Sequence, residues 1–97
     1  MRWAKIFSEI DKSVTAGYET SEIDVSKAQF KRVFVMSNVA NTFRLLVNTG
    51  KGYKEIENLS VPAGGHDFFI LWALPCDKIK IKVDNAATVS IEVEVMT

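Results

Sequence analysis

Two stretches near the C-terminal end, Asp77-Lys78-Ile79-Lys80-Ile81-Lys82-Val83 and Val89-Ser90-Ile91-Glu92-Val93-Glu94-Val95, alternate apolar and polar residues without a break. A period of two is typical of β-strands that bury one face. The five residues between the stretches predict a hairpin in which Val83 lies opposite Val89. In that register the aliphatic side chains share one face, and lysines lie opposite glutamates on the other. The two stretches therefore predict an antiparallel β domain with one solvated face.

Turn-forming residues recur along the rest of the chain at intervals of roughly ten residues, a spacing typical of sandwiches and barrels. They divide the sequence into seven or eight expected strands, at residues 3–10, 18–25, 30–37, 42–48, 53–59, 66–74, 77–83 and 89–95. The first segment also fits a helical stripe, but Ala16-Gly17 shortly after it disfavours a long helix. We predict a single all-β domain over residues 1–97, an antiparallel β-sandwich of jelly-roll type. Its expected core contains Phe68, Ile70, Trp72, Ile79, Ile81, Val83, Ile91 and Val93.

Two of the expected strands are apolar on both faces. The strand at 66–74 has Phe68, Ile70, Trp72 and Leu74 on one face and Phe69, Leu71 and Ala73 on the other. One face belongs in the core, and the second must be covered by another part of the chain or by another subunit. The strand at 30–37 raises the same question. Two such strands on a small domain favour a homo-oligomer or a lattice, with a predicted interface formed by Phe30, Phe34, Met36, Phe69 and Leu71.

Composition narrows the classes of partner. The 97 residues carry 12 basic and 12 acidic side chains, so no net charge would draw the protein to nucleic acid or to an anionic membrane. A lone cysteine, Cys76, excludes an internal disulfide and a multi-cysteine zinc site. The segment from Met1 to Glu9 is too short and too charged for a secretory signal, and no apolar run is long enough to span a bilayer. We therefore expect a soluble protein made inside a cell, located in the cytoplasm unless it belongs to a virion.

Candidate catalytic and metal-binding residues are few. His66 is the only histidine, and the sequence Gly64-Gly65-His66-Asp67 could set an imidazole beside a carboxylate, as a hydrolase requires. No serine or cysteine occupies a nucleophile-elbow motif, however, which favours a solvated histidine at the entrance of a strand. Carboxylate pairs such as Glu92 with Glu94 could hold a cation, but they fit solvated strand faces better. The sequence thus predicts a protein that is not an enzyme, with no catalytic residues, metal or cofactor.

Aromatic residues next to turns could stack on a ligand. Tyr53 directly follows the turn at 49–52, and Tyr18 follows Ala16-Gly17. Without a basic stripe beside them, such rings would suit a carbohydrate better than a nucleic acid. Tyr53 and Tyr18 are therefore the predicted ligand-stacking residues.

Turn and strand signatures follow one another in four segments, Val14-Thr15-Ala16-Gly17, Ser21 to Ser26, Val47 to Ile56 and Leu74 to Val83. Their order resembles that of small β-sandwich modules of tailed-phage and related virion proteins, such as decoration, head-fibre and tail-associated domains. Thr49-Gly50 and Tyr53 stand where those modules usually have Asp-Gly and tryptophan. The resemblance implies a non-enzymatic structural module that binds other virion subunits or a cell-surface glycan.

Three functional hypotheses result. The leading one is a non-enzymatic structural or assembly subunit, virion-associated, that self-associates through apolar strand faces. The alternative is a carbohydrate-binding module that uses Tyr53 and Tyr18. A hydrolase centred on His66 and Asp67 is the third class.

Overall fold

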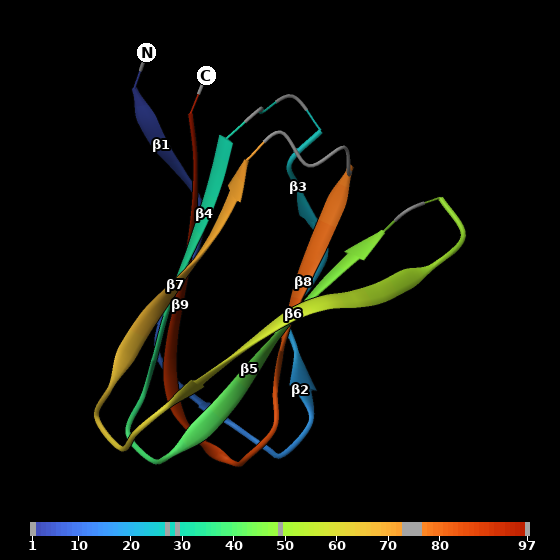
Figure 1. Ribbon diagram of the computed structural model, residues 1–97. Helices are drawn as coiled ribbons and strands as arrows, with labels where there is room; N and C mark the ends of the chain where they lie inside the picture. The colour runs from blue at the N-terminus through green and yellow to red at the C-terminus, as the bar shows by residue number, and fades with distance from the viewer. Residues whose placement is uncertain (1, 27, 29, 49, 73–76, 97) are drawn as a thin grey trace.

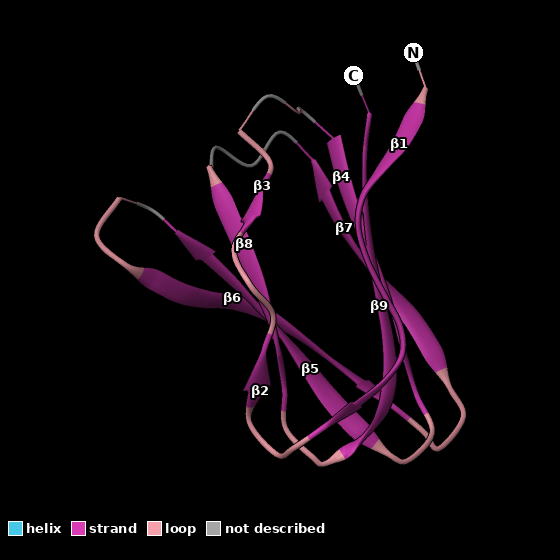
Figure 2. Ribbon diagram, turned by 180° about the vertical axis from the view of Figure 1, so that it is seen from behind, coloured by secondary structure: helices cyan, strands magenta, loops and turns pink. Residues whose placement is uncertain are grey.

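The computed structural model describes residues 2–26, 28, 30–48, 50–72 and 77–96 of the chain, without the side chains of residues 71 and 72. These residues form two antiparallel sheets that pack face to face, and they include no helix (Figures 1 and 2). A helix able to cross a membrane is accordingly not found in this part of the chain. The described strands are β1 (Trp3–Val14), β2 (Tyr18–Glu19), β3 (Ile23–Asp24), β4 (Phe30–Ser37), β5 (Asn41–Asn48), β6 (Tyr53–Val61), β7 (His66–Trp72), β8 (Lys78–Val83) and β9 (Ala87–Met96).

The strands are divided between a four-stranded sheet in the order β1-β9-β4-β7 and a five-stranded sheet in the order β2-β8-β5-β6. In the second sheet β3 also pairs with β8. Apart from β2–β3 and β5–β6, consecutive strands lie in opposite sheets (Figure 1). This arrangement confirms the predicted sandwich of jelly-roll type. Trp3 lies opposite Met96, so the N- and C-terminal strands run side by side (Figure 2).

Most expected strands are present with small shifts at their ends. β4 has the predicted bounds, and the predicted hairpin between β5 and β6 is confirmed, with Asn48 opposite Tyr53. The first segment is a strand. The single strand expected at 18–25 is instead two short strands on either side of Thr20, a buried residue. The Thr20 backbone N–H donates to the Ile81 carbonyl, and its hydroxyl accepts the Ile81 N–H.

The hairpin predicted for the last two strands is wrong. β8 pairs with β5 in the five-stranded sheet, whereas β9 pairs with β1 and β4 in the other sheet. The aliphatic faces of β8 and β9 both point into the core, where Ile79, Ile81, Ile91 and Val93 are fully buried. Alternation predicts which face of a strand is buried, but strands that face each other across a sandwich alternate just as paired strands do.

The charges that suggested this hairpin have partners on other strands. The Lys80 ammonium lies 3.8 Å from the Glu19 carboxylate of β2. Glu92 forms an ion pair with Lys5 of β1. Both charges are thus paired within their own sheets, so lysine–glutamate complementarity did not distinguish between the possible strand pairings.

Asn41, a buried residue at the start of β5, holds the segment that connects β8 to β9. Its Nδ2 donates to the Asn85 carbonyl (3.0 Å), and its Oδ1 accepts the backbone N–H groups of Asn85 (3.0 Å) and Thr42 (2.9 Å). Nδ2 also lies 3.4 Å from the Ser37 hydroxyl at the end of β4. One side chain therefore ties together two places where the chain crosses between the sheets.

The same segment carries a carboxylate that should make stability depend on pH. Arg44 donates from Nε and Nη2 to Asp84, both at 2.8 Å, and these hydrogen bonds hold the pKa of the Asp84 carboxyl below its usual range. The pKa of the Asp84 carboxyl is lower in the folded state than in the unfolded state, where it is about 4. The pair with Arg44 therefore stabilises the folded protein to its full extent at pH values above that unfolded-state pKa. That contribution is lost as the pH falls through the folded-state value.

We expect the free energy of unfolding to fall between pH 5 and pH 2, and Asp84→Asn to remove part of that fall, at most about 1 kcal/mol because the pair is partly exposed. Urea unfolding of both proteins across this pH range measures the difference. An unchanged pH profile in Asp84→Asn would contradict the assignment.

The core lies between the sheets and consists mainly of valine, isoleucine and leucine, with Phe43 and Phe69. On β7 the structure corrects the sequence prediction. Phe69 is 1% exposed, whereas Phe68 and Ile70 are 44% and 56% exposed on the outer face. The predicted core positions of Phe68 and Ile70 are therefore wrong, and so is the predicted subunit-contact position of Phe69. The side chains of Leu71 and Trp72 are not among those that the structure describes. The predicted subunit contact of Leu71 and the predicted core position of Trp72 therefore stay predictions.

The orientation of β7 follows from its neighbour β4. Phe69 lies opposite Val33, a fully buried residue, and Phe68 lies opposite Phe34 on the outer face. The charges of β4 could not indicate this orientation, because each of its faces carries one cation. Arg32 points outward, but Lys31 is 1% exposed, with its ammonium donating to the Ala28 carbonyl at 2.7 Å.

Candidate functional site

The outer face of the four-stranded sheet, here called the open face, places apolar and charged side chains next to one another. Side chains of β4 and β7 make its apolar half, while β1, β9 and Arg32 of β4 supply the charges. The face includes Lys5, Phe30, Arg32, Phe34, Met36, Phe68, Ile70, Glu92 and Glu94. Of the five residues predicted as a subunit interface, Phe30, Phe34 and Met36 lie on this face, half-buried.

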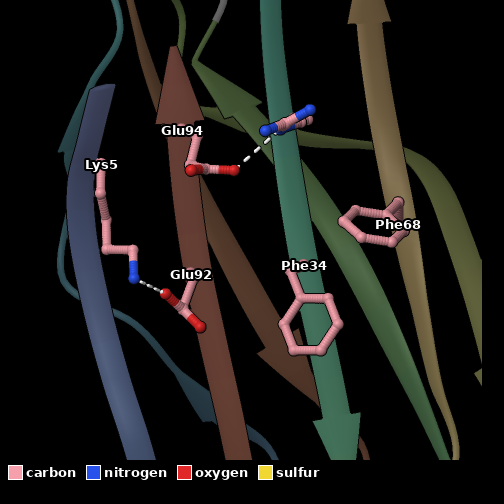
Figure 3. A pocket seen from close by; sticks show the side chains of 6 residues that line it. Lys5, Phe34, Phe68, Glu92 and Glu94 are labelled. Carbon is pink, nitrogen blue, oxygen red and sulfur yellow. Dashed lines mark hydrogen bonds and ion pairs between the residues drawn. The ribbon is translucent and has the colours of Figure 1, made fainter. Parts of the chain in front are cut away.

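A shallow hollow of about 360 Å³ lies where the two halves meet (Figure 3). On its apolar side the rings of Phe34 and Phe68 have centroids 5.2 Å apart and are tilted by 59°. On its charged side Arg32 Nε donates to Glu94 Oε1 at 2.8 Å, and Lys5 pairs with Glu92. The hollow is lined by Lys5, Arg32, Phe34, Phe68, Glu92 and Glu94.

The charges around the hollow are held in place by their neighbours. The Arg32 guanidinium lies over the Trp3 ring, with Cζ 4.0 Å from the ring centroid, so it is fixed by an aromatic face as well as by Glu94. The hydrogen bond to Glu92 raises the pKa of the Lys5 ammonium. Two cations and two carboxylates thus give the hollow fixed donors and acceptors and no net charge.

A second hollow, of about 190 Å³, lies farther along strands β4 and β9. Met36 and Ser90 line it, and they are the next residues after Phe34 and Glu92 on the same faces of β4 and β9. Asp11 borders it where β1 is bulged, with a φ of 50° and a backbone N–H that donates to the Ser90 hydroxyl at 3.1 Å. The remaining lining residues are Ser37, Asn38, Gly64 and Thr88.

Strand β7 forms one border of the open face. It pairs with β4 on one side, and no strand among the described residues pairs with its other side. The Asp67 carboxylate accepts the Phe68 backbone N–H at 2.8 Å near the start of the strand. An edge strand with exposed apolar side chains is a ready site for pairing with another strand.

The two predicted stacking tyrosines do not share a surface. Tyr18 packs partly against the core and donates its hydroxyl to Glu9 (2.7 Å), so ligand stacking there stays a prediction, on a ring that is partly buried. Tyr53 donates to Glu22 (2.5 Å), and the Lys80 ammonium lies 4.6 Å from its ring centroid. Partial burial and the bond to Glu22 raise the pKa of Tyr53 to about 12. Ligand stacking on Tyr53 stays a prediction, on a ring that already has two partners.

The residues of the predicted hydrolase centre, His66 and Asp67, each contact other groups among the described residues. His66 is exposed at the start of β7, and its ring centroid lies 5.7 Å from that of Phe34. The neighbouring Asp67 carboxylate binds a backbone N–H. Cys76 lies outside the described residues. In the part of the chain that the structure describes, no three histidine, cysteine, aspartate or glutamate residues gather as metal ligands would.

This chain is similar to known proteins in its fold and not in its sequence. No family model matches the chain, and no curated protein matches it. A protein of Bacillus endospore appendages, described as disulfide-linked pili, has a similar structure, with a TM-score of 0.60, 12% identity and coverage of 96% of this chain and 82% of its own. These likenesses and those below establish the β-sandwich fold.

Two carbohydrate-related proteins are also similar in structure. A variant of a family 29 carbohydrate-binding module gives a TM-score of 0.54 at 16% identity, over 100% of this chain and 92% of its own. A glycoside hydrolase family 43 arabinoxylan arabinofuranohydrolase from Bacillus subtilis gives 0.53 at 13% identity. It matches 99% of this chain, which spans 27% of the enzyme.

Proposed function

We propose that this chain is a non-enzymatic structural module that associates with copies of itself by pairing of its β7 edges. The observation that carries the proposal is the combination found on β7, where Phe68 and Ile70 are exposed beside an edge that lacks a second strand among the described residues. Natural edge strands usually carry charges, proline or bulges that block pairing, whereas the middle of β7 is apolar.

The sequence of β7 is suited to pairing with itself. Antiparallel pairing of two copies about a twofold axis at Phe69 would place Phe68 of one copy opposite Ile70 of the other. Both residues then lie on the same outer face and cover each other's apolar surface. Because the chain has no net charge, two copies meet without overall repulsion.

Known assemblies with this fold support a structural role. The endospore appendage protein of similar fold is described as forming disulfide-linked pili. Separately, the sequence resemblance to virion modules implies a place in a virion. We propose a virion-associated assembly as the setting for this chain. Pairing of β7 edges about a twofold axis closes at a dimer, so a larger assembly would use this dimer as its unit and add a second contact. Electron microscopy of the concentrated protein then separates the two kinds of assembly, since closed rings or clusters suit a virion and open filaments suit a pilus.

Light scattering over a wide range of protein concentrations tests the proposal. We expect the mass to rise above the 10.9 kDa of one chain as the concentration increases, and Ile70→Lys to prevent that rise because it puts a charge into the seam. Val39→Lys is the matched control, since Val39 is also an exposed aliphatic residue but lies in the connection between β4 and β5. A mass of one chain at every concentration would contradict the proposal.

A further inference from the structure

We infer that the open face also binds a neutral, linear oligosaccharide, seated in the larger hollow between the Phe34–Phe68 pair and the ion pairs of Arg32 and Lys5. The inference rests on the side chains that line the hollow and not on the β7 pairing proposed above. Its volume, about 360 Å³, is within the range of small-ligand sites.

The two sides of the hollow match the two kinds of surface on a sugar ring. A pyranose presents C–H groups on its faces and hydroxyls at its edges. The Phe34 and Phe68 rings, 5.2 Å apart, offer an apolar surface for the C–H groups. Across from them Arg32 and Glu94 offer a donor and an acceptor, and each sugar hydroxyl can act as both.

The charges of the hollow favour a neutral ligand. Each cation is already paired, Arg32 with Glu94 and Lys5 with Glu92. An anionic ligand would have to displace a carboxylate from one of these pairs, and a cationic ligand would have to displace an ammonium or a guanidinium. A hydroxylated neutral ligand can bond to the outer atoms of the pairs without separating them.

The second hollow favours a chain of sugars over a single one. It follows the first along β4 and β9, where Met36 and Ser90 succeed Phe34 and Glu92. From Arg32 to Asn38 the strand direction covers about 20 Å at the usual rise per residue, which is long enough for several linked rings. The Asp11, Asn38 and Thr88 side chains beside the second hollow supply further polar groups.

Pairing of β7 edges and glycan binding are compatible. Edge pairing extends the sheet within its own plane. It brings Ile70 of the second copy beside Phe68, but it leaves Phe34 and Arg32 of β4 and the outer surface of β9 open to a ligand. Arg32 and Glu94 therefore report on the glycan site, while Ile70, which does not line the hollow, reports on the edge.

Isothermal titration calorimetry with cellohexaose, xylohexaose and mannohexaose tests the inference on the whole chain. We expect at least one of them to bind, and the matching monosaccharide to bind at least about tenfold more weakly. Phe34→Ala and Arg32→Ala should each weaken binding at least about tenfold, since each removes one side of the hollow. Arg44→Ala is the matched control, because Arg44 is also ion-paired on a sheet surface but belongs to the five-stranded sheet.

The outcomes separate this inference from the proposed self-association. Loss of binding in Arg32→Ala with an unchanged mass in light scattering supports the glycan site, as does binding that survives in Ile70→Lys. Four results would overturn it: no binding of any neutral oligosaccharide, binding confined to anionic oligosaccharides, binding confined to an apolar peptide, or binding that Tyr53→Ala abolishes while Phe34→Ala does not. None of these bears on whether the protein associates.

Discussion

Phe69→Ala is expected to lower the free energy of unfolding by about 3–5 kcal/mol, the usual cost of truncating a buried phenylalanine. The Phe69 side chain is 1% exposed and lies opposite Val33 in the interior of the sandwich. Its removal leaves a cavity between two sheets whose backbones are fixed by hydrogen bonds, so the surroundings can collapse only in part. Urea or guanidinium unfolding, monitored by tryptophan fluorescence, measures the change.

Phe68→Ala is the matched control, because it makes the same substitution one residue earlier on the same strand. Phe68 is 44% exposed, so the expected loss in the dissociated protein is about 1 kcal/mol or less. Comparison at low protein concentration removes any contribution from association. If Phe68→Ala proved the more destabilising of the two, β7 would face the other way and the proposed interface would have to be redrawn.

Asn41→Ala is expected to cost about 2–4 kcal/mol, although it removes a polar side chain. Asn41 is 4% exposed and binds both the N–H and the carbonyl of Asn85 as well as the Thr42 N–H. Without the amide, backbone groups in two crossing segments lose their partners in a largely buried place. The same unfolding measurement gives the size of the loss.

Asn41→Asp offers a graded comparison. Aspartate keeps an oxygen to accept the two N–H groups but loses the Nδ2 donor to the Asn85 carbonyl, so it should be less harmful than alanine. Asn58→Ala is the control, since Asn58 is exposed on β6 and should change stability by less than about 0.5 kcal/mol. Equal effects of Asn41→Ala and Asn58→Ala would show that the crossing segments do not depend on this side chain.

The fold class could be predicted from the sequence because strand positions depend on local pattern. β4 has its predicted bounds, and the hairpin between β5 and β6 is marked by glycines at its turn. Gly50 and Gly52 both have positive φ, a conformation that glycine adopts without strain. The buried faces of β8 and β9 were likewise predicted correctly.

Local pattern could not predict which strands pair with each other or which face of β7 is buried. Alternation in β8 and β9 is compatible with pairing side by side or with packing across the core, and only the path of the whole chain decides between them. On β7 both faces are apolar, and on β4 Lys31 and Arg32 place a cation on each face. The larger hollow of the open face could not be predicted for a related reason, because its residues come from four strands that are distant in sequence.

Amide hydrogen exchange of β7, measured at low and at high protein concentration, tests the central claim most directly. If copies associate by pairing of β7 edges, amides of His66–Trp72 that do not bond to β4 should become more protected as the concentration and the mass rise, whereas the edge amides of β6 should exchange as before. If the mass rises while exchange along β7 stays the same, the chain associates through another surface and the proposed edge pairing is wrong.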